Sequence, residues 1–278
     1  MKIKPMLAYT IAAKEIDWSK KVYAQPKLDG VRCLLTKDGG YSRTGKKFKN
    51  ITHIELAFVK FFKNNPDAVL DGELYNHKLK DDFEKIISLV RKQKPTADDK
   101  LNAQHLVQYH IYDMVSEDRY TKRYNRLQSL KEMGIDNKVF DIVNTYVVDG
   151  LETCRVVHGK NLVKGYEGTI VRVDAPYEQK RSYTLRKWKD FSDAEATITG
   201  YEEGKGKRQG TLGKFLMTDD EGIEFGCPPG KGYSYKDLSD MLLNIHDYMG
   251  QRATFTYFER TKANSYRHPL FKCLRNYE

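Results

Sequence analysis

The chain has 278 residues and carries 48 Lys and Arg against 38 Asp and Glu, a formal net charge of +10. This length suggests two domains with cores of their own and argues against a small peptide. The basic excess favours a partner that carries phosphate groups, most naturally nucleic acid, although an ordinary basic enzyme stays an alternative. No stretch approaches the roughly 18 apolar residues of a membrane span, and residues 1–10 lack the apolar run of a signal peptide.

The cysteines are too scattered to form a recognisable motif. Cys33, Cys154, Cys227 and Cys273 include no CxxC pair, so the sequence predicts neither a zinc site nor a disulfide framework. We therefore expect reduced thiols and a cytoplasmic location. No coiled-coil pattern is present either, and we expect a monomer.

The first two thirds of the chain alternate strand-like and helical patterns, which predicts an α+β architecture. A strand at 31–36 turns at 37–40 and returns through 41–43, so Lys27 and Arg43 should lie near each other. Residues 52–55 match a capping box and should open a helix whose apolar residues continue to Phe62. Further strands are expected at 68–75, 106–115 and 168–173, and further helices at 83–91, 119–133 and 151–164.

The pattern changes after Trp188. Five short strands, with one helix between the third and the fourth, suit a small oligonucleotide-binding (OB) barrel. We expect the boundary near 190–193, with domains at 1–190 and 191–278. The expected strands are 194–201, 211–218, 223–225, 252–257 and 270–274, and the helix is 235–248.

Lys27 opens the segment Lys27-Leu28-Asp29-Gly30-Val31-Arg32, in which Gly30 would permit a close approach to a ligand. Alone, such a hexamer is more typical of a solvated loop. It is followed in order by Ser42-Arg43-Thr44-Gly45, Asp71-Gly72-Glu73-Leu74, Tyr112-Asp113, Glu167-Gly168-Thr169-Ile170-Val171-Arg172 and Lys187-Trp188-Lys189. This series resembles the covalent nucleotidyltransferases, which comprise ATP-dependent DNA ligases, RNA ligases and mRNA capping enzymes. The resemblance covers residues 27–189, with a short further match at Arg267.

The resemblance implies both a fold and a reaction. The fold is an adenylation domain of the nucleotidyltransferase type (ATP-grasp-like) with antiparallel sheets, followed by a C-terminal OB barrel. In the reaction a lysine attacks the α-phosphate of ATP and keeps AMP as a phosphoramidate. The AMP then passes to the 5′-phosphate of a nick, which the 3′-hydroxyl attacks. We expect an ATP-dependent DNA ligase that uses ATP and Mg²⁺, or Mn²⁺, on nicked duplex DNA in replication or repair, with Lys27 as its nucleophile.

A lysine needs help to act as a nucleophile, because its free pKa of about 10.4 keeps it protonated. Nearby positive charge favours the neutral amine, and Arg43, Lys187, Lys189 and the metal could supply it. The same cations would neutralise the α-phosphate. Lys187 and Lys189 alternate around Trp188 on a strand, so both should face the nucleotide while Trp188 points into the core.

The remaining nucleotide contacts follow from the resemblance. Glu167 matches the residue that holds the divalent metal, Glu73 the residue at the ribose, and Tyr112 the ring that stacks on adenine. A carboxylate plus phosphate oxygens is a usual way to bind Mg²⁺. Ordinary alternatives stay open, because glutamates are mostly exposed and strand aromatics mostly belong to cores.

Three further residues match positions near the DNA ends or the pyrophosphate. Arg32 falls where ligases contact the 5′-phosphate of the nick, and Asp29 where they approach the 3′-hydroxyl. Arg267, in Tyr266-Arg267-His268-Pro269, resembles the barrel arginine that orients pyrophosphate, with a plain surface arginine as the alternative. If it has that role, the barrel must close over ATP and then open for DNA.

The grip on DNA should differ from that of many viral relatives, which carry a long hairpin, or latch, in the barrel. Residues 202–210 are too few to cross a duplex about 20 Å wide and return at roughly 3.3 Å per residue. We therefore predict no latch, and expect Lys205, Lys207 and Arg208 to contact phosphates, with a solvated basic loop as the alternative. Lys122 and Arg123 are weaker candidates for the same role.

Two other functions stay open. An RNA ligase or a capping guanylyltransferase would share the lysyl-nucleotide step, although residues 193–198 (Asp-Ala-Glu-Ala-Thr-Ile) resemble DNA ligases more closely. A non-catalytic nucleic-acid-binding protein, with the barrel as its working part, is the alternative of another class. The intact set of charged motifs argues against it.

Overall fold

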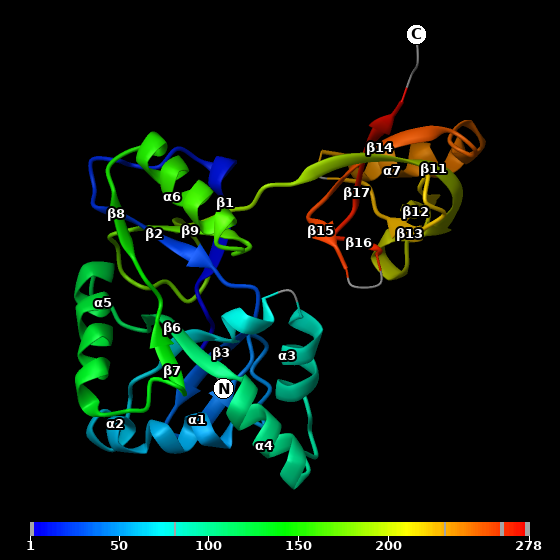
Figure 1. Cartoon of the computed structure of the whole chain (residues 1–278). Coiled ribbons are helices and arrows are strands. Elements are labelled where there is room, and N and C mark those ends of the chain that lie inside the picture. Colours follow the sequence, from blue (N-terminus) through cyan, green and yellow to red (C-terminus); the bar gives the residue numbers. More distant parts are fainter. Residues whose placement is uncertain (1–2, 81, 231, 262–263, 276–278) are drawn as a thin grey trace. The chain divides into compact units, whose positions relative to one another are not determined.

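A computed structural model of the chain describes residues 3–80, 82–230, 232–261 and 264–275. The chain divides into two compact units, residues 1–189 and 190–278, which are taken separately below (Figure 1). Over the described ranges, no helix combines the length and the apolar character that crossing a membrane requires.

The first sheet of unit 1 has the strand order β1-β10-β9-β2-β8, and every pair is antiparallel except β1 with β10. Helix α6 (Leu151–Val163) packs on this sheet, where Cys154 joins a buried cluster with Val22, Ala24 and Val171. In that order the strands are β1 (Leu7–Thr10), β10 (Arg181–Trp188), β9 (Gly168–Val173), β2 (Val22–Lys27) and β8 (Tyr146–Val148).

The second sheet of unit 1 has the order β4-β3-β5-β6-β7, with only β6 and β7 parallel. The expectation of antiparallel sheets is therefore right for most pairs and wrong for one pair in each sheet. The strands are β4 (Gly39–Tyr41), β3 (Val31–Thr36), β5 (Leu70–Tyr75), β6 (Gln108–Met114) and β7 (Phe140–Ile142).

The helices of unit 1 agree only partly with the sequence prediction. The expected helix at 119–133 is an α-helix that tightens into a 3-10 turn and ends at Gly134, whose φ of 72° is left-handed. The helices α1 to α5 are Thr52–Ala57, Val59–Asn64, Phe83–Val90, Ala97–Leu106 and Tyr120–Gln128, and the 3-10 helices are Ile11–Ala13, His77–Leu79 and Ser129–Met133.

The predicted capping box at Thr52 is wrong. The N-cap is Ile51, which makes no side-chain capping bond, and the Glu55 carboxylate accepts a hydrogen bond from the Gly40 backbone at 3.2 Å instead. The helix also breaks at Phe58, whose fully buried ring contacts the rings of its neighbours in the core. Tertiary packing thus overrides the local signal.

Unit 2 contains the five strands and the helix predicted from the sequence. Its antiparallel sheet has the order β13-β12-β11-β14-β17. The Phe271 backbone bonds to Pro228 and Gly230, just beyond β13, which closes the sheet into a barrel. The strands are β11 (Ser192–Glu203), β12 (Leu212–Thr218), β13 (Glu224–Cys227), β14 (Arg252–Tyr257) and β17 (Leu270–Leu274), with a hairpin of β15 (Glu259–Arg260) and β16 (Tyr266–Arg267).

The helix of unit 2 is shorter than predicted. Helix α7 (Tyr235–Leu243) is capped by Ser234, whose side chain accepts from the Asp237 backbone, and a 3-10 turn (Ile245–Asp247) follows it. Leu238, Met241 and Ile245 fill the barrel core beside Phe215. Among the described residues of this unit, the 3-10 helices are Gly206–Arg208 and Ile245–Asp247.

Candidate active site

A cleft of about 1160 Å³ in unit 1 is lined by residues of both of its sheets. Lys27 comes from β2 and Lys187 from β10, while Glu73 and Tyr112 come from β5 and β6. Arg43, which is exposed in the turn after β4, also lines the cleft, so it lies near Lys27 as expected. The structure thus brings together five residues that the sequence assigned to nucleotide chemistry.

Lys27 ends β2, and its ammonium is held by the buried carboxylate of Glu167. The second oxygen of Glu167 pairs with Lys189, so one carboxylate holds two ammonium groups at the cleft. The Glu167 backbone N–H also donates to the Lys27 carbonyl at 3.1 Å. The next residue, Gly168, has φ +150°, and a Cβ there would lie 2.1 Å from the Trp188 carbonyl oxygen. Only glycine therefore allows β10 to approach this closely.

Lys187 and Lys189 lie on either side of Trp188, but they have different environments. Lys187 lines the cleft, whereas Lys189 is linked to Lys27 through the shared carboxylate of Glu167. The Trp188 ring stacks on His158 of α6 at 4.5 Å and packs against the core, as predicted. His158 in turn hydrogen-bonds the Thr169 hydroxyl at 2.9 Å, which ties α6 to the start of β9.

Glu73 and Tyr112 are neighbours on β5 and β6. The Tyr112 hydroxyl donates to Glu73 Oε2 at 3.2 Å. Burial raises the pKa of Glu73 to about 7, although the charges of Lys27 and Arg32 act to lower it. Two guanidinium groups lie near the Tyr112 ring, with Arg32 at 5.7 Å and Arg172 at 5.5 Å from its centroid.

The residues matched to the DNA ends differ in their surroundings. Arg32 lines the cleft, but its Nε and Nη2 donate to Asp71 at 2.9 and 2.5 Å. Asp29 lies half-buried between β2 and β3 and does not line the cleft. A Cβ on Gly30 would lie 2.5 Å from the Leu74 carbonyl oxygen, so this glycine permits the close approach of β5, and it also lines the cleft.

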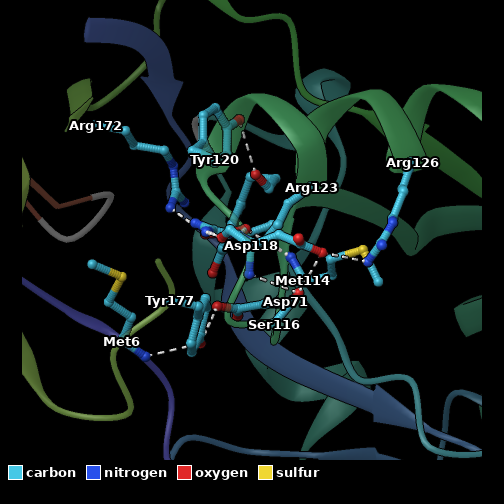
Figure 2. Close-up of polar contacts among 12 residues, drawn as sticks. Met6, Asp71, Met114, Ser116, Asp118, Tyr120, Arg123, Arg126, Arg172 and Tyr177 are labelled. Atoms are coloured by element: carbon cyan, nitrogen blue, oxygen red, sulfur yellow. Dashed lines mark hydrogen bonds and ion pairs between the residues drawn. The ribbon is translucent and has the colours of Figure 1, made fainter. Parts of the chain in front are cut away.

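A buried charge network lies beside the cleft (Figure 2). Asp113 accepts hydrogen bonds from Arg123 Nε at 2.7 Å and from Arg172 Nη1 at 2.6 Å, and Arg172 Nε donates to Gln25 at 2.6 Å. Asp71 faces Asp113 across β5 and β6 and would repel it, but Arg32 neutralises Asp71. The network therefore compensates two buried carboxylates with three guanidinium groups.

This network corrects one prediction. Arg123 was a candidate for DNA contact, but it is 1% exposed and its guanidinium is committed to Asp113. Lys122 stays exposed and pairs with Asp118 at 2.8 Å. Arg123 Nη1 also donates to the Asp118 and Ala175 carbonyl oxygens, so this residue fastens α5 to two loops.

Asp71, Asp113 and Arg172 lie within the sequence motifs, but no role was predicted for them. A signal was available at Asp113, because alternation along β6 places it on the same face as Tyr109 and Ile111, which belong to the core. A buried carboxylate requires a cationic or hydrogen-bonding partner. The motif arginines were the natural partners to propose.

Glu167 is the candidate metal ligand. Within the described ranges no group of three or more His, Cys, Asp or Glu side chains could hold a metal ion. A single carboxylate is nevertheless enough for Mg²⁺ when substrate phosphates provide other oxygens. The donor set fits that mode, in which Glu167 would provide one oxygen ligand and the phosphates of a nucleotide would provide others.

The candidate residues of unit 2 lie on its surface. Lys205, Lys207 and Arg208 are exposed in the connection from β11 to β12, which spans only residues 204–211 and agrees with the absence of a latch there. Arg267 lies in β16, pairs with Glu259 and stands 5.8 Å from the Phe258 ring centroid.

Comparison with known proteins agrees with this geometry. The family model for the ATP-dependent DNA ligase domain matches residues 5–189, and that for the DNA ligase OB-like domain matches residues 203–275. The DNA ligase of Haemophilus influenzae is 26% identical over 215 residues, which cover 76% of this chain and 72% of that protein. The DNA ligase of Methanosphaera stadtmanae is 24% identical over 232 residues, covering 78% of this chain but only 41% of that longer protein.

A solved structure agrees over the full length. It is described as "DNA binding with a minimal scaffold: Structure-function analysis of Lig E DNA ligases", and it superimposes with a TM-score of 0.80 at 26% identity. The match covers 99% of this chain and 100% of that one. Because the ligase-domain model alone covers more than half of the chain, the chain belongs to the ATP-dependent DNA ligase family.

Proposed function

We propose that this protein seals nicks between a 3′-hydroxyl and a 5′-phosphate in duplex DNA through an adenylate carried on Lys27. One observation carries the proposal above the others. Lys27 projects at the cleft, and a buried carboxylate, Glu167, holds its ammonium together with that of Lys189. A lysine fixed in this way, beside a space large enough for a nucleotide, suits a covalent nucleotidyl carrier.

In the first step the Lys27 amine would attack the α-phosphate of ATP. A phosphorus–nitrogen bond forms, the bond to pyrophosphate breaks, and the amine gives up its protons. Glu167 is hydrogen-bonded to this nitrogen and is the nearest proton acceptor that the contacts identify. Arg43 and Lys187, which line the same cleft, favour the neutral amine and stabilise charge on the phosphates.

The nucleoside would lie at the other wall of the cleft. Tyr112 offers a ring that two guanidinium groups hold in place, which suits stacking on adenine. Glu73 lies at hydrogen-bonding distance from that ring's hydroxyl, where it can bond to the ribose. Glu167, with phosphate oxygens, would hold Mg²⁺ or Mn²⁺, and the bound ion would supply further charge neutralisation at the phosphates.

The DNA steps rest on fewer observations. Arg32 lines the cleft and would contact the 5′-phosphate, with Asp29 near the 3′-hydroxyl. Arg267 of the barrel would orient pyrophosphate during adenylation, and Lys205, Lys207 and Arg208 would bind DNA phosphates in place of a latch. The monomeric state and the cytoplasmic location stay predictions from the sequence.

The test combines nick sealing with covalent labelling. The protein should seal nicked duplex DNA with ATP and Mg²⁺, and should become labelled by α-labelled ATP. Lys27→Ala should abolish both while leaving the circular dichroism spectrum unchanged. Labelling by GTP alone would favour a capping enzyme, and sealing of RNA but not DNA would favour an RNA ligase. Full DNA binding without any labelling would indicate a non-catalytic binding protein.

A further inference from the structure

Arg186 on β10 is a buried charge with unmet hydrogen-bonding capacity. It is 2% exposed, and its Nε and Nη1 have no hydrogen-bond partner. Its only hydrogen bond among the described residues is from Nη2 to the Lys14 carbonyl oxygen at 3.4 Å, and no carboxylate there pairs with it. The other buried arginines of unit 1, Arg123 and Arg172, are both fixed by Asp113. An unpaired buried guanidinium lowers stability, so its presence calls for an explanation.

The surface above Arg186 combines aromatic rings with further cations. Tyr9 and Tyr183 stack at 4.1 Å with an interplanar angle of 4°, and the Arg186 guanidinium lies 5.0 Å from the Tyr183 ring centroid. Arg181 lies 5.6 Å from the Tyr9 ring and Lys14 lies 5.8 Å from the Tyr183 ring. We call these five residues the Arg186 patch.

The patch has the chemistry of a phosphate site. Lys14 and Arg181 are exposed, and neither makes an ion pair with a carboxylate in the described part of the chain. Tyr183, whose ring covers Arg186, is 48% exposed, so it can rotate without disrupting the core. Rotation would uncover N–H donors on Nε and Nη1 of a charged guanidinium, and a phosphate oxygen is a strong acceptor for such donors.

The position of the patch separates it from the nucleotide site. Leu185 and Lys187 line the cleft, and alternation over residues 185–188, where β10 pairs regularly with β9, directs Arg186 to the opposite face. The pairing of β10 with β1 shifts register before Arg186, and the Tyr183 ring lies beside the Arg186 guanidinium. Arg181 belongs to both regions, because it lines the cleft and also lies against Tyr9. A DNA strand that leaves the cleft past Arg181 would therefore meet the patch next.

We propose that Arg186, together with Lys14 and Arg181, binds a backbone phosphate of the nicked DNA outside the adenylation cleft, with Tyr183 moving aside. This assignment rests on the nick-sealing function proposed above. It explains why a buried cation is kept without a protein partner, because the DNA supplies that partner. Without DNA, the protein is then less stable than it would be with a neutral side chain at position 186.

The experiment measures binding of the full-length protein to nicked duplex DNA without ATP, across a series of salt concentrations. Arg186→Met should weaken binding roughly three- to tenfold and reduce the slope of log K against log salt by about 0.9, the value for one phosphate contact. Its midpoint of thermal unfolding should be unchanged or higher, because a neutral side chain of similar length replaces an unpaired buried charge. Lys60→Met on α2 removes the same charge from an exposed site and is the matched control, with the wild-type slope expected.

Two results would overturn the proposal. Unchanged affinity and slope with a lower unfolding midpoint would make Arg186 a structural residue. If Arg186→Met needs a higher ATP concentration for half-maximal labelling but binds DNA as the wild type does, Arg186 contacts a phosphate of the nucleotide and not of the DNA. If Arg186→Met does not fold, the same salt series is measured on Lys14→Met, which changes the exposed rim of the patch. A salt slope equal to that of the wild type in this variant would refute phosphate binding by the patch. Wild-type protein that binds DNA through the patch but is not labelled by ATP would refute the adenylation proposal instead.

Discussion

Asp113 is the residue whose loss should cost the most stability, and the structure allows the cost to be bounded. Its carboxylate accepts from Arg123 Nε and Nη2 at 2.7 and 3.2 Å and from Arg172 Nη1 at 2.6 Å. All three residues are buried. Asp113→Ala would leave two guanidinium groups without their carboxylate, and breaking one buried ion pair already costs about 3–5 kcal/mol. Because two such pairs are broken, we expect unit 1 to lose about 5 kcal/mol, the upper end of that range.

Urea unfolding followed by tryptophan fluorescence measures this loss, because Trp18 and Trp188 both lie in unit 1. Asp118→Ala is the matched control. Among the described residues the Asp118 carboxylate pairs with the exposed cations Lys122 and Arg126 and accepts from the Ser116 hydroxyl, so its loss should cost far less. If Asp113→Ala destabilises the protein no more than Asp118→Ala does, the buried network does not hold unit 1 together.

Three further outcomes are expected. Because burial raises the pKa of Glu73 from 4.5 to about 7, the folded state holds its proton more tightly. That stabilisation is full below pH 4.5 and is lost as pH rises through 7, so the free energy of unfolding of the wild type should decline between these pH values. Glu73→Gln has no titrating group at this position, so urea unfolding at a series of pH values should show a smaller decline for this variant. Gly168→Ala should displace β10 and slow labelling of Lys27 at least tenfold. The control is Gly134→Ala, because Gly134 has φ +72° but open space around it; this change should lower stability by only about 1–2 kcal/mol and leave labelling unaffected. Replacing the three basic residues of the loop at 205–208 with Ala should reduce the salt slope of DNA binding by up to about 2.7, and an unchanged slope would exclude them from the interface.

The strands predicted best from the sequence are those with clear alternation and clear turns. β3, β9 and β17 have the predicted bounds, because each is flanked by polar or turn residues that end the pattern. The short strands β1, β7 and β8 were not predicted, since three or four residues show no period. Helix α4 was missed for a related reason: its sequence, ADDKLNAQHL, has no continuous apolar stripe, so only the capping box of Thr96 and Asp99 marks its start.

Strand β2 shows a limit of a different kind. It carries the nucleophile but contains Pro26, which normally argues against a central strand. The topology removes the conflict, because β8 pairs only with Val22, Tyr23 and Ala24, so Pro26 has a neighbour on one side alone. No local pattern could have revealed this, since it depends on where a strand more than 100 residues away ends.

The candidate site was predicted well as a set of residues and less well as a set of contacts. The motif order placed Lys27, Glu73 and Tyr112 at one cleft, where the structure has them. It did not indicate that Arg32 and Arg172 are fixed by Asp71 and Asp113. A resemblance assigns residues to ligands, whereas the partners they have without a ligand depend on the strand register.

The carboxylates of unit 1 fall into two kinds, and the difference bears on how the site works. Asp71 and Asp113 are matched by rigid guanidinium forks, which are weakly hydrated and make two directed bonds each. Glu167 is matched by two lysines, whose ammonium groups are compact, mobile and readily exchanged between partners. Under the proposed function the phosphates of ATP compete with Glu167 for these ammonium groups. The arginine pairs would then keep the walls of the cleft fixed, while the lysine pairs would keep the nucleophile at the point of attack and release it when the nucleotide enters.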